Sequence, residues 1–256
     1  MRRMIDIHCH ILNQLDDGPK TETGSLAMAQ QAIAEGFTDI IATPHHLKGD
    51  YFNLRPSVAE HVAELNEAIK DNGMELTVHV GQEVRLHGEI IEGLKNGDLA
   101  SLAGSRYVLI EFPTQSIPVF TEQLFYDLQM AGYVPVIAHP ERNFEIMDNP
   151  ERLYDFVSHG ALAQLTWGSL DGKFGKKSKK SSEILLENQL VHFLATDAHD
   201  TVRRPLLHQG IEERLVRKIG SEYVEYLKGN GANVLKNDLI VAEDYSMPSQ
   251  KRFFLF

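Results

Sequence analysis

Met4-Ile-Asp-Ile-His-Cys-His10 is a short apolar run near the start of the chain that ends in two histidines separated by one residue. Such a run is typical of a strand that is buried on both faces of a sheet. Residues two apart on a strand project to the same face, so Asp6, His8 and His10 would be aligned if the extended backbone continues. Two imidazoles at this spacing can chelate one cation. The stretch therefore predicts a buried strand with a metal site at its end.

Six further runs of the same kind follow, each rich in Ile, Val and Leu. The predicted strands are residues 4–8, 39–42, 76–80, 107–110, 134–138, 162–166 and 191–195. Predicted helices alternate with most of them, which implies a parallel sheet with right-handed crossovers. The predicted fold is α/β, a distorted seven-stranded (β/α) barrel of the TIM-like type. A doubly wound open sheet is the alternative, because seven strands do not dictate closure.

The helices are predicted from apolar residues that recur at helical spacing. They span residues 24–35, 58–72, 89–95, 121–130, 150–158, 182–187 and 204–228. Gly36 is expected to end the first helix and Ser57 to cap the second. With 256 residues, the chain is expected to form one domain, residues 1–256, and a split into two domains is less favoured.

Potential metal ligands follow most of the predicted strands. After the first run they occur in Thr43-Pro44-His45-His46, Gln82-Glu83, Glu111-Phe112-Pro113, His139-Pro140-Glu141-Arg142 and Asp197-Ala198-His199. Asp197 and His199 repeat the spacing of His8 and His10. The C-terminal ends of all strands in a parallel barrel open on one face, so these side chains would meet there. The pattern predicts a polynuclear metal centre and a metal-dependent hydrolase.

Composition excludes several other classes. The formal net charge of -11 argues against a nucleic-acid-binding surface, which needs a basic face. No run approaches the ~18 apolar residues of a membrane span, and the start of the chain is a poor signal peptide, so the cytoplasm is the expected location. Cys9 is the only cysteine. A thiol-based phosphatase also needs an arginine at a fixed short distance after its cysteine, where this chain has Leu15.

Two segments depart from the general pattern. Residues 172–180 carry five lysines on an acidic protein. Such a run is ordinarily a solvated loop or helix entry, and the functional alternative is a docking patch for an acidic or phosphorylated partner. The tail, residues 251–256, is unusually apolar for a terminus and is expected to pack on its own barrel or on a neighbouring subunit. The sequence leaves homo-oligomerisation open.

The motifs Asp-Ile-His-x-His, Asp-Asp-Gly, Ala-Thr-Pro-His, Gly-Gln-Glu, Glu-Phe-Pro, Ala-His-Pro-Glu-Arg and Ala-Thr-Asp-Ala-His occur in this order between Asp6 and about Arg204. The series resembles that of the PHP (polymerase and histidinol phosphatase) superfamily. It is most similar to the bacterial manganese-dependent protein-tyrosine phosphatases of capsule and exopolysaccharide loci, the YwqE/CpsB type. The resemblance implies a PHP fold and hydrolysis of phosphotyrosine on a bacterial tyrosine kinase or a related protein. Cys9 falls on a position that the motif leaves free.

The resemblance also implies three divalent cations, with manganese suggested and iron or zinc open. The implied ligands are His8, His10, Glu83 and Asp197 for the first cation, Glu83, Glu111 and His139 for the second, and Asp17, His45 and His199 for the third. Asp16 is the rival of Asp17, since spacing cannot separate adjacent carboxylates, and His46 is the less favoured neighbour of His45.

Arg142 and Arg204 are implied to grip phosphoryl oxygens. The implied mechanism is attack by a hydroxide that the cations generate from bound water. Asp200 is one candidate for protonating the leaving group. Phe112 and Trp167 could border a substrate ring, although core packing is the commoner fate of such residues. Two other functions stay open: a small-molecule phosphomonoesterase such as a histidinol-phosphate phosphatase, and a metal-binding scaffold.

Overall fold

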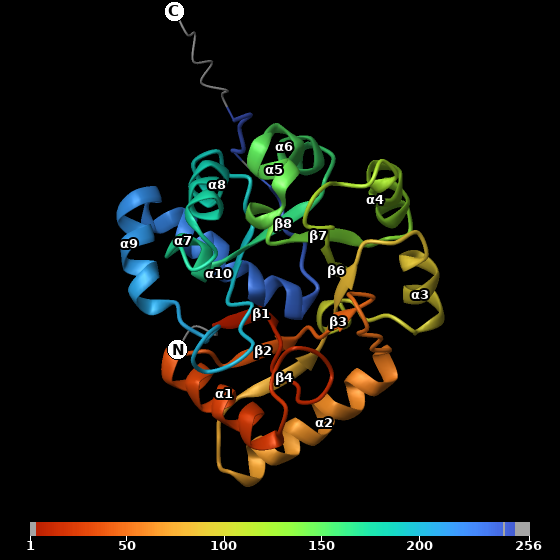
Figure 1. Cartoon of the computed structure of the whole chain (residues 1–256), viewed down its shortest axis with the longest axis vertical. Coiled ribbons are helices and arrows are strands. Elements are labelled where there is room, and N and C mark those ends of the chain that lie inside the picture. The colour runs from red at the N-terminus through yellow and green to blue at the C-terminus, as the bar shows by residue number, and fades with distance from the viewer. Residues whose placement is uncertain (1–3, 243, 249–256) are drawn as a thin grey trace, which may run out of the picture.

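Figure 1 shows the computed structural model of the chain, which describes residues 4–242 and 244–248. Their strands form two parallel sheets, with the order β1-β2-β4 in the smaller and β3-β5-β6-β7-β8-β9 in the larger. The strands are β1 (Ile5–Cys9), β2 (Asp39–Ala42), β3 (His45–His46), β4 (Thr77–Val80), β5 (Glu83–Arg85), β6 (Tyr107–Glu111), β7 (Val134–Ala138), β8 (Leu162–Thr166) and β9 (Phe193–Ala195). The predicted α/β class with parallel sheets is confirmed. The apolar tail, residues 251–256, lies outside the described residues.

Two of the strand regions are interrupted, which the sequence analysis did not predict. Residues 43–44 separate β2 from β3, and residues 81–82 separate β4 from β5, so each region contributes to both sheets. Pro44 lacks the N–H that a ladder needs. A Cβ at Gly81 would lie 2.6 Å from Cγ2 of Ile41, so the backbone approaches its neighbour closely there. The residues that follow these interruptions, in β3 and β5, pair with each other in the larger sheet.

The helices surround the sheets (Figure 1). They are α1 (Glu22–Glu35), α2 (Arg55–Asp71), α3 (Ile90–Asn96), α4 (Thr121–Met130), α5 (Phe144–Asp148), α6 (Glu151–Ser158), α7 (Trp167–Leu170), α8 (Lys176–Glu187), α9 (Gln209–Ile219) and α10 (Ser221–Lys236), with the 3-10 turns η1 (Leu102–Gly104) and η2 (Pro140–Arg142). Gly36 ends α1 in the left-handed conformation, as predicted. No helix within residues 4–242 and 244–248 has the length and hydropathy that a membrane span requires.

Three helix predictions were wrong. The second helix begins at Arg55 rather than after Ser57; its N-cap is Leu54, which makes no side-chain cap bond. The predicted helix 204–228 is two helices, because Gly220 between α9 and α10 adopts φ 87° and ψ 155°, a conformation open to glycine. The predicted helix 182–187 begins earlier, at Lys176, so most of the lysine-rich run is helical.

A buried apolar cluster joins strands of both sheets with α10. It includes Ile41 on β2, Leu109 on β6, Phe193 on β9 and Val234 on α10. Close packing of α10 on β1 depends on Gly231, where a Cβ would lie 3.0 Å from Cβ of Ile5. This packed interior provides a rigid base for the polar side chains at the ends of the strands.

Candidate metal centre

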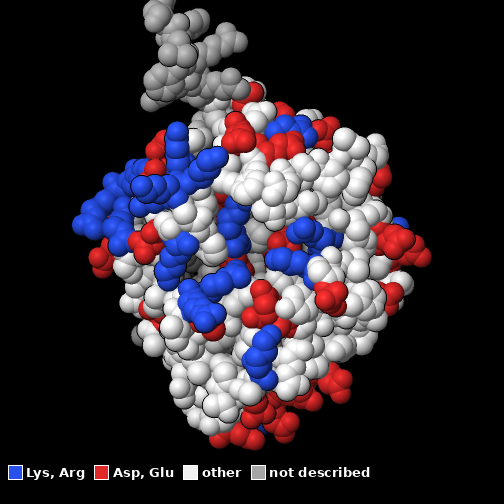
Figure 2. Space-filling model, in the orientation of Figure 1, with Lys and Arg blue, Asp and Glu red and all other residues white. Residues whose placement is uncertain are grey.

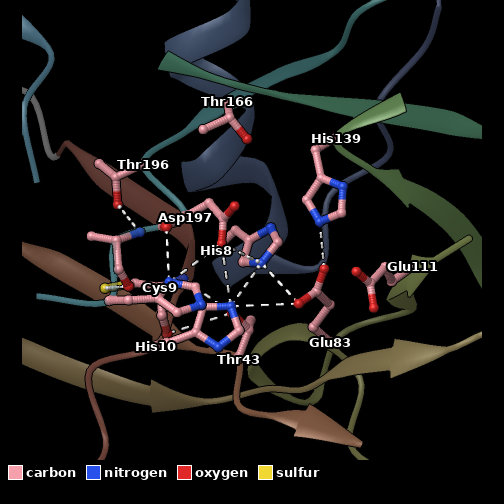
Figure 3. Close-up of polar contacts among 12 residues, drawn as sticks. His8, Cys9, His10, Thr43, Glu83, Glu111, His139, Thr166, Thr196 and Asp197 are labelled. Carbon is pink, nitrogen blue, oxygen red and sulfur yellow. Dashed lines mark hydrogen bonds and ion pairs between the residues drawn. The ribbon is translucent and has the colours of Figure 1, made fainter. Parts of the chain in front are cut away.

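Four buried side chains point their ligand atoms at one another (Figure 3). Nε2 of His8 lies 3.2 Å from Nε2 of His10. Both nitrogens lie 3.3 to 3.4 Å from Oε2 of Glu83 and from Oδ1 of Asp197. Neighbouring ligands of a tetrahedral cation held at about 2.0–2.1 Å lie about 3.3–3.4 Å apart. The donor atoms of His8, His10 and Asp197 all lie within 4.8 Å of one another, and Glu83 approaches both histidines from an adjoining ligand group. These side chains therefore have donor atoms and spacings that suit a divalent cation.

The two histidine rings of this cluster are oriented by neighbouring oxygens. Nδ1 of His8 lies 2.8 Å from Oε1 of Gln164 on β8, and Nδ1 of His10 lies 2.6 Å from Oδ2 of Asp16. A proton on Nδ1 donated to such an oxygen leaves Nε2 unprotonated and able to bind a cation. Neither partner was assigned this role from the sequence.

Glu83 also faces a second group of side chains. Its Oε1 lies 2.6 Å from Nε2 of His139, and His8, Glu83 and His139 together offer donor atoms within 4.8 Å of one another.

Two residues of the centre have an unusual backbone conformation. His139 adopts φ 34° and Asp197 φ 50°, left-handed conformations that are uncommon outside glycine. Strain of this kind gathers at functional sites.

Glu111 lies next to Glu83, as the motif resemblance implies, and also next to His45. The three side chains form one group of possible metal ligands, and Glu111 lines a pocket together with His139. Its carboxylate lies 2.8 Å from Nζ of Lys48 and 3.0 Å from Nη1 of Arg85. The structure thus brings Glu111 to the centre but gives it two cationic partners, neither of which the sequence analysis identified.

A further group combines His10, Asp17, His45 and His199. Oδ1 of Asp17 lies 3.2 Å from Nε2 of His199 and 3.5 Å from Nε2 of His45. The Asp17 side chain is 45% exposed, so this group opens to solvent. The geometry distinguishes the two adjacent carboxylates that the sequence left open, because Asp16 is buried behind His10 and Asp17 faces the group.

Unsatisfied polar atoms at the centre support cation binding. Nδ1 of His45 and Oε2 of Glu83 are buried and make no hydrogen bond within the described part of the chain, although they lie only 2.6 Å apart. Buried polar atoms are ordinarily bonded, so such a pair needs an explanation. Imidazole and carboxylate donors without thiolate suit manganese, iron or zinc. The residues present fit divalent cations.

Glu83, Asp197, His139 and His199 are held in the form that binds metal. Burial favours neutral carboxyls, but nearby imidazoles, His45 first, hold the pKa of Glu83 well below its usual range. The guanidinium of Arg142 does the same for the pKa of Asp197. Burial lowers the pKa of His139 to about 3 and that of His199 to about 4.

The pKa values of His8 and His10 are shifted in the opposite direction. Burial acts to lower the pKa of both histidines, but the charge of Glu83 raises the pKa of His8. The charge of Asp16 raises the pKa of His10 well above its usual range. Protons and divalent cations therefore compete for these two rings.

Two arginines converge on the centre from different segments. Nη2 of Arg142, on η2, donates to Oδ2 of Asp197, and Nη2 of Arg204 donates to the same oxygen at 2.5 Å. The ring centroid of Phe174 lies 4.5 Å from Cζ of Arg142 and 5.7 Å from Cζ of Arg204. Both predicted arginines are thus at the centre, with an aromatic ring that the sequence analysis missed.

The remaining candidates are buried. Phe112 and Trp167 belong to the hydrophobic core, and Phe112 also lines the pocket that contains Glu111, His139 and Arg142. His46 is buried with its Nδ1 2.6 Å from the carbonyl oxygen of Asn53, outside the ligand groups. Cys9 is fully buried, and burial raises the pKa of its thiol, which keeps it protonated. In the sequence, the one feature that could have indicated a role for Phe174 is its position between Gly172 and Gly175 in the lysine-rich run.

Parallel sheets that gather imidazoles and carboxylates at the ends of their strands define an α/β protein with a metal centre of the mixed nitrogen and oxygen type. A family model described as capsular polysaccharide synthesis, CpsB/CapC, matches residues 4–236. The chain belongs to the CpsB/CapC family. The similarity to phosphatases of the YwqE/CpsB type that the motifs predicted is confirmed by the relatives described next.

The similarity to known proteins extends over nearly the whole chain. The chain is 44% identical to tyrosine-protein phosphatase YwqE of Bacillus subtilis (strain 168), and the match covers 99% of this chain and 100% of that protein. Identity to the putative tyrosine-protein phosphatase CapC of Staphylococcus aureus is 43%, over 98% and 99%. A crystal structure from work on YwqE and on CpsB of Streptococcus pneumoniae, described as unique metal-dependent tyrosine phosphatases, matches with a TM-score of 0.94. That match has 44% identity and covers 96% of this chain and 100% of the other.

Proposed function

We propose that this chain is a metal-dependent phosphotyrosine-protein phosphatase. The observation that carries the proposal is the cluster of His8, His10, Glu83 and Asp197 beside two arginines, in which the two histidine nitrogens lie 3.2 Å apart and 3.3 to 3.4 Å from each carboxylate. The names of the relatives, tyrosine-protein phosphatases at 43% and 44% identity, support phosphotyrosine as the substrate.

Three cations are proposed, with manganese as the native metal and iron or zinc as alternatives. The proposed ligands are His8, His10, Asp17, His45, Glu83, Glu111, His139, Asp197 and His199. Bound there, the cations would lower the pKa of water and neutralise phosphoryl oxygens. Glu83 supports a shared role, because its two carboxylate oxygens face different imidazoles, His45 and His139.

Arg142 and Arg204 are proposed to bind the phosphoryl group. Their Nε atoms are buried and have no hydrogen-bond partner within the described residues, so both guanidiniums have a donor left for an anion. A planar fork of N–H donors suits two phosphate oxygens. Lys48, next to the pocket formed by Glu111, His139 and Arg142, adds a further positive charge.

The tyrosyl leaving group needs little assistance from a general acid of the protein. A tyrosine hydroxyl has a pKa near 10, so its anion leaves with less help from a general acid than an alkoxide would. Asp200 is poorly suited to that task. Burial acts to raise its pKa, but its carboxylate accepts from the amides of Val202 at 2.7 Å and Arg203 at 2.5 Å, and together such bonds hold the pKa below its usual value.

We also infer a closed barrel from the pairing of the strands. An isolated parallel bridge between Cys9 and Ala198 connects the end of β1 to the segment after β9. Because residues 39–46 and 77–85 each contribute to both sheets, the pairings are consistent with one distorted seven-stranded ring in a single domain of residues 1–256.

A bacterial tyrosine kinase of capsule synthesis is the proposed protein substrate, and the cytoplasm is the proposed location of the reaction.

Turnover of a substrate panel by the manganese-loaded protein tests this function. We expect a phosphotyrosine peptide to be hydrolysed faster than phosphoserine peptide, histidinol phosphate or sugar phosphates. Cys9→Ser is the control for a thiol mechanism and should keep wild-type activity, because the thiol is buried. Preference for histidinol phosphate would instead identify a small-molecule phosphatase, and no turnover of any substrate would favour a scaffold.

A further inference from the structure

Five exposed lysines gather next to the candidate metal centre. Lys173, Lys176, Lys177, Lys179 and Lys180, here called the lysine surface, belong to a chain with a formal net charge of -11. Figure 2 shows Lys and Arg side chains concentrated over α8 and α9, and continuing toward the hollow in the middle of the same face. The protein thus presents a local basic surface in spite of its overall acidity.

The charges of this surface are not neutralised by neighbouring acids. In the part of the chain that the structure describes, none of the five lysines forms an ion pair. Nearby cations on α9 do so: Lys218 lies 3.0 Å from Glu183, and Arg214 lies 2.6 Å from Asp171. The lysine surface therefore keeps its charge available for a partner.

The position of these lysines is unfavourable for the helix that carries them. Four of the five lie in the first turns of α8, which has no acidic residue in its first turn. A helix N-terminus carries a partial positive charge, so lysines there are repelled by the helix dipole and by one another. A sequence that breaks a local rule of this kind commonly does so at a functional site.

The surface is continuous with the metal centre. Phe174, which contacts Arg142, lies between Lys173 and Lys176 in the sequence, and α8 packs against η2. Consecutive Cα atoms are about 3.8 Å apart, so both lysines lie within about 8 Å of Phe174 along the backbone. An extended peptide advances about 3.3–3.6 Å per residue. Residues a few positions from a tyrosine whose phosphate reaches Arg142 therefore come within reach of the lysines.

We propose that the lysine surface binds acidic residues that flank the phosphotyrosine of the protein substrate. This inference rests on the proposed phosphatase function and specifies its substrate class. Attraction between exposed charges adds mainly to encounter rate and specificity, and it weakens as salt is added. The lysine surface would thus select acidic phosphotyrosine segments, while the arginines and metal ligands act on any phosphotyrosine.

An anionic membrane is a different partner for a basic helix, and the structure favours the peptide. Stable attachment to a membrane combines basic residues with apolar side chains that insert into lipid. The segment from Lys173 to Lys180 contains one large apolar residue, Phe174, and its ring is engaged by the two arginines. The apolar side chains of α8, Leu185 and Leu186, are buried.

The test compares two phosphotyrosine peptides of equal length, one with Asp and Glu around the tyrosine and one with Asn and Gln. The triple variant Lys176→Gln/Lys177→Gln/Lys180→Gln removes charge from the surface. Its matched control removes the same charge from exposed lysines elsewhere, as Lys70→Gln/Lys95→Gln/Lys236→Gln. Each manganese-loaded protein is assayed for kcat/KM on both peptides and on p-nitrophenyl phosphate. Affinity for non-hydrolysable phosphonate versions of the peptides is measured by fluorescence anisotropy.

Wild type and control should prefer the acidic peptide by about tenfold at low salt, a preference that 0.5 M salt suppresses and that the lysine triple variant loses. All three proteins should hydrolyse p-nitrophenyl phosphate equally. Equal handling of both peptides by wild type, an unchanged preference in the triple variant, or lysine-dependent binding to phosphatidylserine vesicles without a peptide preference would overturn the inference. Failure to hydrolyse any phosphotyrosine compound would overturn the proposed function instead, and anisotropy would still decide whether the lysines bind acidic peptides.

Discussion

Nδ1 of His10 lies 2.6 Å from the carboxylate of Asp16, while the other ring nitrogen of His10 faces Glu83 and Asp197. Asp16 is further fixed by the amides of Gly18 at 2.9 Å and His45 at 3.0 Å. One carboxylate thus connects the loop after β1 to the start of β3. We infer that Asp16 orients His10 in the proposed centre rather than binding a cation itself.

Asp16→Asn should weaken metal binding without removing a binding position. Loss of a carboxylate that orients a ligating histidine typically costs about tenfold to a hundredfold in metal affinity. Manganese titration should therefore show weaker binding with the wild-type number of ions. Asp17→Asn is the matched control, and it should lower the number of bound ions, because Asp17 faces His45 and His199 directly. The reverse pattern would show that Asp16 is the ligand.

Phe174→Ala should reduce turnover while leaving metal content unchanged. The ring lies against the guanidinium of Arg142. Cation–π contacts of this kind stabilise the position of the guanidinium by about 0.5–2 kcal/mol. We expect kcat/KM for a phosphotyrosine peptide to fall about twofold to thirtyfold. Phe174→Tyr should restore it, and Phe120→Ala, an exposed phenylalanine next to α4, should have no effect. Loss of bound metal in Phe174→Ala would assign the ring a structural role instead.

Gly220→Ala should destabilise the fold. Gly220 separates α9 from α10 at φ 87° and ψ 155°, a region that costs a residue with a Cβ about 1–3 kcal/mol. A Cβ there would meet no other atom within 4 Å, so backbone strain is the whole effect. Urea unfolding measures the loss. Gly210→Ala, inside α9 with equally open surroundings, should be neutral or stabilising. Equal stabilities for the two variants would contradict the assigned break.

His192 should make the protein less stable in acid. Burial lowers its pKa to about 3, and its Nδ1 accepts from the amide of Ala163 at 3.0 Å. The unfolded chain binds this proton near pH 6.5 and the folded chain does not, so stability is lost as the pH falls below about 6.5. At pH 5 this one group costs about 2 kcal/mol. The free energy of unfolding should decrease less between pH 7.5 and pH 5 in His192→Gln than in wild type, and by the wild-type amount in His61→Gln. An equally large decrease in His192→Gln would show that His192 does not cause the loss of stability in acid.

The predictable part of the fold is the part set by local apolar patterns. The runs at residues 39–42, 134–138 and 162–166 have the bounds of β2, β7 and β8, because buried parallel strands read as short aliphatic runs. The break at Gly220 depends on a backbone conformation that the helical pattern around it does not reveal. The bends at Pro44 and Gly81 depend on what each backbone meets in the folded protein. A single residue in the sequence does not reveal those surroundings.

The same distinction holds at the centre. His8, His10 and Asp197 could be predicted to meet because their positions at strand ends imply a shared face. The choice between Asp16 and Asp17 depends on the path of a loop. The pairing of Glu111 with Lys48 and Arg85, and the ring of Phe174 beside the arginines, join segments that carry no common spacing. Such contacts become visible only when the segments are placed in space.

The central claim is that His8 and Asp197 hold a catalytic divalent cation. The most direct measurement is metal content per folded chain, by mass spectrometry, together with hydrolysis of a phosphotyrosine peptide, for wild type, His8→Ala, Asp197→Ala and the exposed control His159→Ala. We predict that both site variants stay folded, bind at least one ion fewer and lose about a hundredfold to a thousandfold or more of their activity, whereas the control matches wild type. Full metal content and wild-type hydrolysis in His8→Ala and Asp197→Ala would contradict the claim.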